Sequence, residues 1–158
     1  MDILKNDLIR LRAVEPSDAE KMWEMECDSE QWIHNGMSAP YSLNNLRDYA
    51  NNYDADPIRS GQLRLIIEKN DDHNVIGMID LYDISPIHRT AFIGIYISKA
   101  FRREGYALLA IGLLEKYCSN LLNLFQIGAK IMDGNVPSEL LFEKAGFIRQ
   151  CILPKWYK

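Results

Sequence analysis

Alternating apolar and polar positions predict most of the strands in this chain, because a spacing of two is typical of strands buried on one face. Residues 8–14 and 125–131 alternate in this way, whereas residues 91–97 are almost continuously apolar and predict a buried strand. A polar turn, Asn70–Asn74, joins two further strand-like stretches into an expected hairpin. The predicted strands are residues 8–14, 62–69, 75–82, 91–97, 125–131 and, as a last candidate, 147–153.

Capping residues mark the predicted helices. Ser17, with Glu20 three residues later, forms a capping-box pattern, while Pro137 suits a first helical turn and Gly146 a helix end. The predicted helices run from Ser17 to about Asp28, from after Ser42 to about Tyr53, from Ala107 to near Asn120 and from Ser138 to Ala145. The order β-α-α-β-β-β-α-β-α-β predicts an α/β (α+β) fold, in which helices cover a mixed sheet.

The composition is ordinary for a globular protein. At 158 residues the chain suits a single domain, residues 1–158, and it is 47% hydrophobic and 25% charged. Its 18 Lys and Arg residues against 22 Asp and Glu residues give a net charge of −4. A general nucleic-acid-binding protein usually carries a basic surface, so no nucleic-acid partner is expected.

Cysteine and histidine usage predicts neither a disulfide framework nor a metal site. The 3 histidines have no ligand spacing, and the cysteines are odd in number and far apart, at Cys27, Cys118 and Cys151. Free thiols are typical of a reducing compartment. The N-terminus lacks a signal-peptide core, and no apolar run has membrane-spanning length. We therefore expect a cytoplasmic protein with no metal and no membrane partner.

The segment Arg102–Ala107 is the strongest candidate for a ligand site. It lies between the apolar strand and a predicted helix, and a helix N-terminus presents free N–H groups and a partial positive charge. Gly105 allows the backbone to approach a ligand closely, and two arginines supply donors that suit phosphate oxygens. The alternative is a solvated basic turn, which the glycine and the strand–helix context disfavour.

Two motifs resemble the GNAT superfamily of acyl-CoA-dependent N-acetyltransferases. Arg102-x-x-Gly105-x-Ala107 fits the family's pyrophosphate-binding signature, and Asn135 followed by Leu141–Phe147 is similar to its "Asn…Leu-Tyr-Glu-Lys-x-Gly-Phe" helix. The resemblance covers nearly the whole chain and implies a mixed, mostly antiparallel central sheet flanked by helices. It also implies acetyl-CoA as co-substrate and a primary amine, on a small molecule or a peptide, as acceptor.

Within the superfamily, residues 80–91 resemble the spermidine (polyamine) N-acetyltransferase branch, with the ribosomal-protein N-acetyltransferases as close relatives. The polyamine branch carries two acids on this strand and Ile/Val-His-Arg before the central strand, and Pro40-Tyr41 also matches it. However, Ser38-Ala39 stands where that branch has an acidic pair. This departure puts specificity for a polyamine in question.

The resemblance assigns a cofactor role to several segments. The central strand is expected to separate from its neighbour after Ile97, so that backbone groups of Ile95, Tyr96 and Ile97 bind the pantetheine arm. Gly94 marks either a bulge or close approach, or a small residue under a helix. Asn135 is expected to bind the cofactor arm, to cap the short helix, or both. The expected cofactor-binding residues are Ile95, Tyr96, Ile97, Arg102, Arg103, Glu104, Gly105, Tyr106, Ala107, Leu108, Asn135, Ser138, Phe142 and Lys144.

The family's usual general acid is a tyrosine, and Phe142 occupies that position here. Ser138, four residues earlier on the same helix face, is the nearest candidate donor, with water, Tyr106 or Tyr96 as alternatives. Asp80 and Asp83 are three apart on a strand and are therefore expected on opposite faces. Asp80, which matches the branch's inner acid, is the expected catalytic base.

Residues 15–30 contain seven acids and one base, Lys21. Such a stretch would attract a cationic acceptor, although a solvated helix face is the favoured explanation for most of these acids. The family normally continues with a further strand after the segment around Cys151, so an unpaired edge is expected, with a homodimer or higher homo-oligomer as one outcome. The rival function is a catalytically weak acyl-CoA-binding or regulatory module, which Phe142 motivates.

Overall fold

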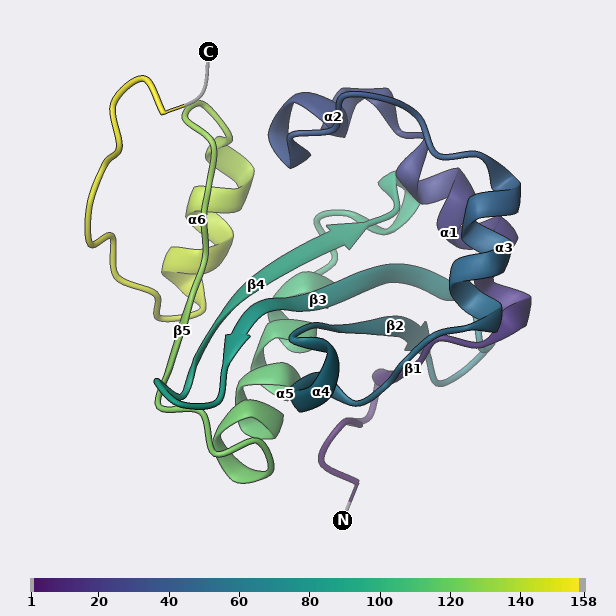
Figure 1. Ribbon diagram of the computed structural model, residues 1–158, viewed down its shortest axis with the longest axis horizontal. Helices are drawn as coiled ribbons and strands as arrows, with labels where there is room; N and C mark the ends of the chain where they lie inside the picture. The colour runs from purple at the N-terminus through teal and green to yellow at the C-terminus, as the bar shows by residue number, and fades with distance from the viewer. Residues whose placement is uncertain (1, 157–158) are drawn as a thin grey trace.

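Five strands form one mixed sheet in the computed structural model, which describes residues 2–156 (Figure 1). Their order in the sheet equals their order in the chain, β1 to β4 are antiparallel, and β5 runs parallel to β4. The expected mostly antiparallel sheet is therefore confirmed. Residues 1, 157 and 158 of the expected domain lie outside the described residues. The strands are β1 (Ile9–Ala13), β2 (Leu63–Lys69), β3 (Val75–Ser85), β4 (Thr90–Ile97) and β5 (Gln126–Gly128).

Helices cover both faces of this sheet. The longest, α5 (Tyr106–Asn120), packs on one face, while α1 (Ala19–Glu26) and α3 (Leu43–Asn51) pack together on the other (Figure 1). In the part of the chain that the structure describes, no helix is long and apolar enough to span a membrane. The remaining helical segments are η1 (Pro16–Asp18), α2 (Ser29–Asn35), α4 (Pro57–Ser60), η2 (Lys99–Phe101) and α6 (Val136–Lys144).

The central hairpin is apolar because its strands are buried on both faces. Alternate residues such as Ile67 and Ile79 join Ile111 of α5 in the larger core cluster. The intervening residues Ile66 and Met78 pack instead with the buried methionines of α1. Such double burial removes the alternation that a half-exposed strand would show. The hairpin that the sequence predicts over residues 62–82 is confirmed.

The first predicted helix is wrong at both ends. A 3₁₀ turn comes first, and it is Asp18, rather than Ser17, whose carboxylate accepts the backbone N–H of Glu15 at 2.8 Å. Helix α1 then ends at Glu26, and the unexpected helix α2 begins at Ser29. The carboxylate of Asp28, between the two helices, binds partners on β4 and beyond it.

The predicted strand over residues 147–153 is not present. No backbone hydrogen bond joins this segment to β5 or to another described strand, and a strand forms only where such a ladder exists. Its apolar side chains therefore remain exposed, among them Ile148, Ile152 and Leu153. The strand expected over residues 125–131 is likewise shorter, at Gln126–Gly128.

An ionic cluster joins β1 to β2 at the buried carboxylate of Glu68, which is 3% exposed. Arg10 and Arg12 both donate to it, His73 lies 3.0 Å away, and Arg12 also binds Asp18. Burial alone would raise the pKa of Glu68, but the hydrogen bonds from Arg12, Arg10 and His73 outweigh it and lower the pKa to about 2.

We expect the Glu68 cluster to lose its stabilising effect in acid. The carboxyl has a reference pKa of 4.5 and a folded-state pKa of about 2, so its contribution is complete above the higher value and is lost as the pH falls toward the lower. Within that window, each pH unit should remove up to about 1.4 kcal/mol of unfolding free energy. Urea unfolding of wild type and Glu68→Gln across this range measures the difference, and parallel pH profiles for the two proteins would contradict it.

Candidate active site

Strands β4 and β5 pair for only three residues before they separate. The ladder joins Thr90, Ala91 and Phe92 to Gln126, Ile127 and Gly128, and Figure 1 shows the two chains diverging from that point. The expectation that separation begins after Ile97 is therefore wrong, because it begins after Phe92. The reason is that β5 ends at Gly128, where a Cβ would lie only 3.0 Å from the Phe92 ring, and the chain then leaves the sheet.

Beyond this point no strand within residues 2–156 pairs with one edge of β4. The Ser98 N–H donates to Ile76 of β3, so Tyr96 and Gly94 also direct their backbone groups to β3, since the direction alternates along a strand. Ile95 then directs its N–H and C=O to the open side, as does Ile97. Arg102 Nε donates to the Ile97 carbonyl at 2.7 Å, which supports this orientation. An amide-containing ligand could thus pair with Ile95, but not with the backbone of Tyr96.

The turn before α5 has the geometry of an anion site. Gly105 is the N-cap with φ 85°, Arg103 has φ 65°, and, its chain neighbours apart, no atom of residues 2–156 lies within 4 Å of where a Gly105 Cβ would be. The first backbone hydrogen bond of the helix is donated by Leu109 to Gly105, so the N–H groups of Tyr106 to Leu108 point out of the helix end. The positive end of a 15-residue helix adds to their attraction for a phosphate.

The two arginines of this turn differ in environment. The Arg102 guanidinium is directed inward, where it binds the Ile97 carbonyl and the Asp28 carboxylate and lies over the Tyr96 ring. Arg103 and Glu104 are exposed, and no ion pair of Arg103 occurs within residues 2–156. The sequence assigned the same role to both arginines, but only Arg103 has a guanidinium free to meet a phosphate.

Helix α6 presents Asn135 and Ser138 in its first turn. The Asn135 side chain accepts the Ser138 N–H at 3.4 Å, so its capping role is present. Ser138 is half-buried, whereas Lys144, at the other end of α6, is exposed. Phe142 is 5% exposed and packs edge-on against Phe147, with 5.0 Å between ring centroids. Its ring belongs to the main core and offers no proton.

Asp80 lies on the α1 side of the sheet in an ion pair that the sequence did not suggest. Both carboxylate oxygens accept from Arg64 at 2.8 Å, and Arg64 also donates to Glu26 at 2.8 Å. Directly opposite Asp80 in the ladder is Gly94, where a Cβ would meet only Tyr82 Cε1, at 3.8 Å. There is no register shift at Gly94, so its lack of a side chain leaves space beside Asp80 next to the open edge of β4.

Asp83 is not placed by simple alternation. It has φ 49° and lies at a register shift between Tyr82 and Ser85. Regular alternation of side chains, which predicted that Asp80 and Asp83 lie on opposite faces of the sheet, therefore does not apply to it. Its exposed carboxylate lies 3.3 Å from Lys130, whose ammonium sits over the Phe92 ring.

Tertiary contacts neutralise most of the acidic stretch over residues 15–30. Only Lys21 comes from within the stretch, and the other bases come from β1, α3, β2 and the segment formed by η2 and its C-cap. Glu15 is the one acid of the seven without an ion pair in the described chain. The pairs are Asp18 with Arg12, Glu20 with Arg47, Glu24 with Lys21, Glu26 with Arg64, Asp28 with Lys99 and Arg102, and Glu30 with Lys99.

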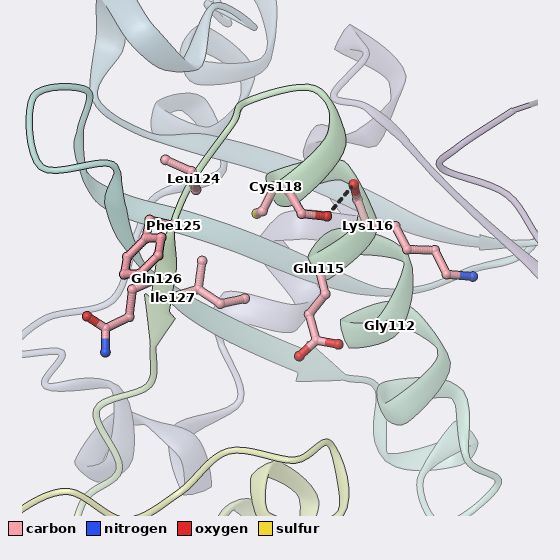
Figure 2. Close-up of a pocket in the computed structure, with 9 residues that line it drawn as sticks. Gly112, Glu115, Lys116, Cys118, Leu124, Phe125, Gln126 and Ile127 are labelled. Carbon is pink, nitrogen blue, oxygen red and sulfur yellow. Dashed lines mark hydrogen bonds between the residues drawn. The ribbon is translucent and has the colours of Figure 1, made fainter.

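Two cavities flank these elements. One, of about 460 Å³, is polar and lies between the α1–α2 junction and the end of β4, where Asp28, Tyr96 and Lys99 line it. The other, of about 430 Å³, lies between the C-terminal half of α5 and β5, and Figure 2 shows Glu115 and Ile127 on its walls. This second cavity is at the opposite end of α5 from Gly105 and is separate from the candidate site.

Comparison with known proteins identifies the family of this chain. Residues 9–148 match the family model described as an acetyltransferase (GNAT) domain. The chain belongs to this family. It is accordingly an acyl-CoA-dependent N-acetyltransferase, and the resemblance that the sequence motifs suggested is confirmed.

The relatives include both expected branches. YdaF of Bacillus subtilis, provisionally named a ribosomal N-acetyltransferase, is 29% identical, with 92% of this chain and 80% of that protein covered. Spermidine N(1)-acetyltransferase of Vibrio cholerae is 26% identical, with 92% and 82% covered. A crystal structure of the Vibrio cholerae spermidine N-acetyltransferase with CoA and spermine has a TM-score of 0.80 at 26% identity, with 92% of this chain and 84% of that chain covered.

Proposed function

We propose that this GNAT enzyme transfers an acetyl group from acetyl-CoA to a primary amine. The observation that carries the proposal is the turn at Gly105, which leaves the first N–H groups of α5 open beside the unpaired edge of β4. A pyrophosphate and an extended amide-containing arm are the two chemical features that such a pair of sites would recognise.

Each part of the donor has a candidate binding group in this chain. The N–H groups from Arg103 to Leu108 would bind the pyrophosphate, and the exposed Arg103 guanidinium would add charge. Ile95 would hydrogen-bond the pantetheine amides. Bound acetyl-CoA supplies an acetyl thioester as the electrophile. Helix α6 and its N-cap follow the segment that diverges from β4. They carry Asn135, Ser138 and Lys144, which are therefore candidates to bind the pantetheine arm from the side opposite Ile95.

The transfer requires an amine, a proton acceptor and a proton donor. The neutral amine attacks the thioester carbonyl, a C–N bond forms, the C–S bond breaks, and the thiolate takes up a proton. Asp80, beside the space at Gly94, would hold the acceptor nitrogen and receive its proton directly or through water. The Ser138 hydroxyl remains the nearest candidate donor, because the buried Phe142 cannot serve.

The charges around the candidate acceptor site are nearly balanced. The acids of residues 15–30 are nearly all paired with bases, and the Glu26–Arg64–Asp80 cluster has a formal charge of only −1. We therefore propose an acceptor with one cationic amine, such as a protein N-terminus of the kind the ribosomal branch modifies. Spermidine is the second candidate, because relatives named for it have a similar fold and are 26% identical in sequence.

A thiol-release assay with acetyl-CoA tests this proposal directly. The acceptor panel comprises spermidine, spermine, small monoamines and N-terminal peptides, and mass spectrometry of the product locates the acetyl group. Turnover on peptides that exceeds turnover on polyamines supports the N-terminal assignment, and the reverse order supports a polyamine. If CoA binds but no acceptor is acetylated, the chain is instead an acyl-CoA-binding module, the alternative that Phe142 motivates.

Asp80→Asn should raise KM for the amine about tenfold while leaving KM for acetyl-CoA unchanged, since a hydrogen bond to a charged group is worth about 1.5 kcal/mol or more. The asparagine keeps the shape of the carboxylate but loses the negative charge that attracts the acceptor. Asp83→Asn, on the same strand but paired with Lys130 at the surface, is the matched control. A change in KM for acetyl-CoA, or equal effects in both variants, would contradict this role.

We also infer that the protein self-associates. Strand β5 has a free edge, and Phe125, next to it, is 81% exposed. A Vibrio cholerae spermidine N-acetyltransferase that is 25% identical is described as dodecameric, which supports a homo-oligomer for this chain. Light scattering after size exclusion distinguishes a monomer from an assembly.

A further inference from the structure

Asp28 connects the donor turn to the helices on the other side of the sheet. It lies at the junction of α1 and α2, and its side chain is 9% exposed. Tyr96 Oη donates to Asp28 Oδ2 at 3.0 Å, and Arg102 Nη2 donates to the same oxygen at 3.3 Å. Lys99 Nζ lies 3.8 Å from the other oxygen. The side chain therefore touches three residues of the segment that leads from β4 into the turn.

These contacts keep the carboxylate ionised and the phenol protonated. Burial by itself would raise the pKa of Asp28, but the Tyr96 hydrogen bond and the charges of Lys99 and Arg102 outweigh it and lower the pKa. Burial, followed by the hydrogen bond to Asp28, raises the pKa of Tyr96 to about 12. A charge-assisted hydrogen-bond network of this kind has one preferred geometry.

Arg102 connects the Asp28 hydrogen bonds to the turn. Its Nε donates to the Ile97 carbonyl at 2.7 Å, so the side chain spans from the turn back to the end of β4. Its guanidinium also lies 5.3 Å from the centre of the Tyr96 ring. The next residue, Arg103, has φ 65°, a conformation that residues with a side chain rarely adopt without support. Asp28 is the acceptor that fixes the far end of the Arg102 side chain.

We propose that Asp28 is a positioning residue for the donor: through Arg102 and Tyr96 it holds the turn so that the N–H groups of α5 face the pyrophosphate. This inference rests on the proposed function. It assigns Arg102 to the support of the turn and leaves direct phosphate contact to Arg103 and the backbone.

The Asp28→Asn variant distinguishes a positioning role from simple charge attraction, because the two predict opposite changes in CoA affinity. Asp28→Asn removes a negative charge near an anion site and frees the charge of Arg102, which would strengthen CoA binding. The positioning role requires CoA binding to weaken instead, because the amide cannot hold Arg102 as a carboxylate does. The sign of the change therefore separates the two effects.

Calorimetry with CoA and with pantetheine, titrated at millimolar concentration, provides the test. We expect Asp28→Asn to weaken CoA binding about tenfold, which corresponds to about 1.4 kcal/mol, and to leave pantetheine binding unchanged, because pantetheine lacks the pyrophosphate. Tyr96→Phe, which removes only the hydroxyl, should weaken CoA binding in the same direction by a smaller factor. It also keeps the test valid if Asp28→Asn fails to fold.

Glu30→Gln is the matched control. Glu30 binds Lys99 from an exposed position and makes no recorded contact with Arg102 within residues 2–156, so this variant should bind CoA as the wild type does. Wild-type affinity in Asp28→Asn, tighter binding, or an equal loss for pantetheine would overturn the positioning role alone. A wild-type protein that binds no CoA would overturn the proposed function as well.

Discussion

Gly105→Asp should abolish the thermal stabilisation that CoA gives to the wild-type protein. The new side chain would place a carboxylate where the pyrophosphate is proposed to bind, at a position now open to solvent. Gly105 also has φ 85°, a conformation that costs a residue with a Cβ about 1 kcal/mol or more. A ligand at a hundred times its Kd stabilises a protein by about 2.7 kcal/mol, and this increment should disappear.

The control for this variant is Gly61→Asp. Gly61 ends α4 with φ 73°, so the backbone strain is comparable, and in the described part of the chain only its own neighbours lie within 4 Å of an added Cβ. It lies far along the chain from α5 and belongs to neither proposed ligand site. Thermal melts with and without CoA should show a lower melting temperature for both variants, and a CoA-dependent rise only for Gly61→Asp. A retained rise in Gly105→Asp would show that the pyrophosphate binds elsewhere.

Arg64→Met should destabilise the fold by about 3 kcal/mol, because removal of one partner from a largely buried ion pair leaves the other charges uncompensated. The Arg64, Glu26 and Asp80 side chains are 19%, 12% and 31% exposed, so little solvent is available to replace the guanidinium. Arg64 also lies over the Tyr49 ring, a contact that methionine would keep only in part.

Arg59→Met provides the comparison for Arg64. Arg59 makes a similar bidentate pair with Asp54 on the surface, where its side chain is 72% exposed, and such pairs contribute at most about 1 kcal/mol. Urea unfolding, with both the midpoint and the slope measured, gives the free energy of each variant. Equal losses of unfolding free energy in the two variants would mean that the Glu26–Arg64–Asp80 cluster stabilises the fold no more than a surface ion pair does.

Local patterns were sufficient for those parts of the site that depend on neighbouring residues. The strand–turn–helix around Gly105, the α6 cap at Asn135 and the central hairpin all follow from short-range spacing, and the structure places each where the sequence predicts it. The last strand, helix α2 after Asp28 and the point where β4 and β5 separate were not predicted correctly. Each of these depends on a partner distant in sequence, and no local pattern reports that partner.

The sequence by itself determined the family and the position of the turn, because a strand, a turn and a helix N-terminus are built from consecutive residues. Only the tertiary structure decided which charges remain free. Arg102 and Arg103 are adjacent and chemically identical, yet one is held by Asp28, 74 residues earlier, and the other is exposed. Asp80 likewise acquires Arg64 from the neighbouring strand. The energy of an interaction between charges depends on the distance between them, and the fold sets those distances.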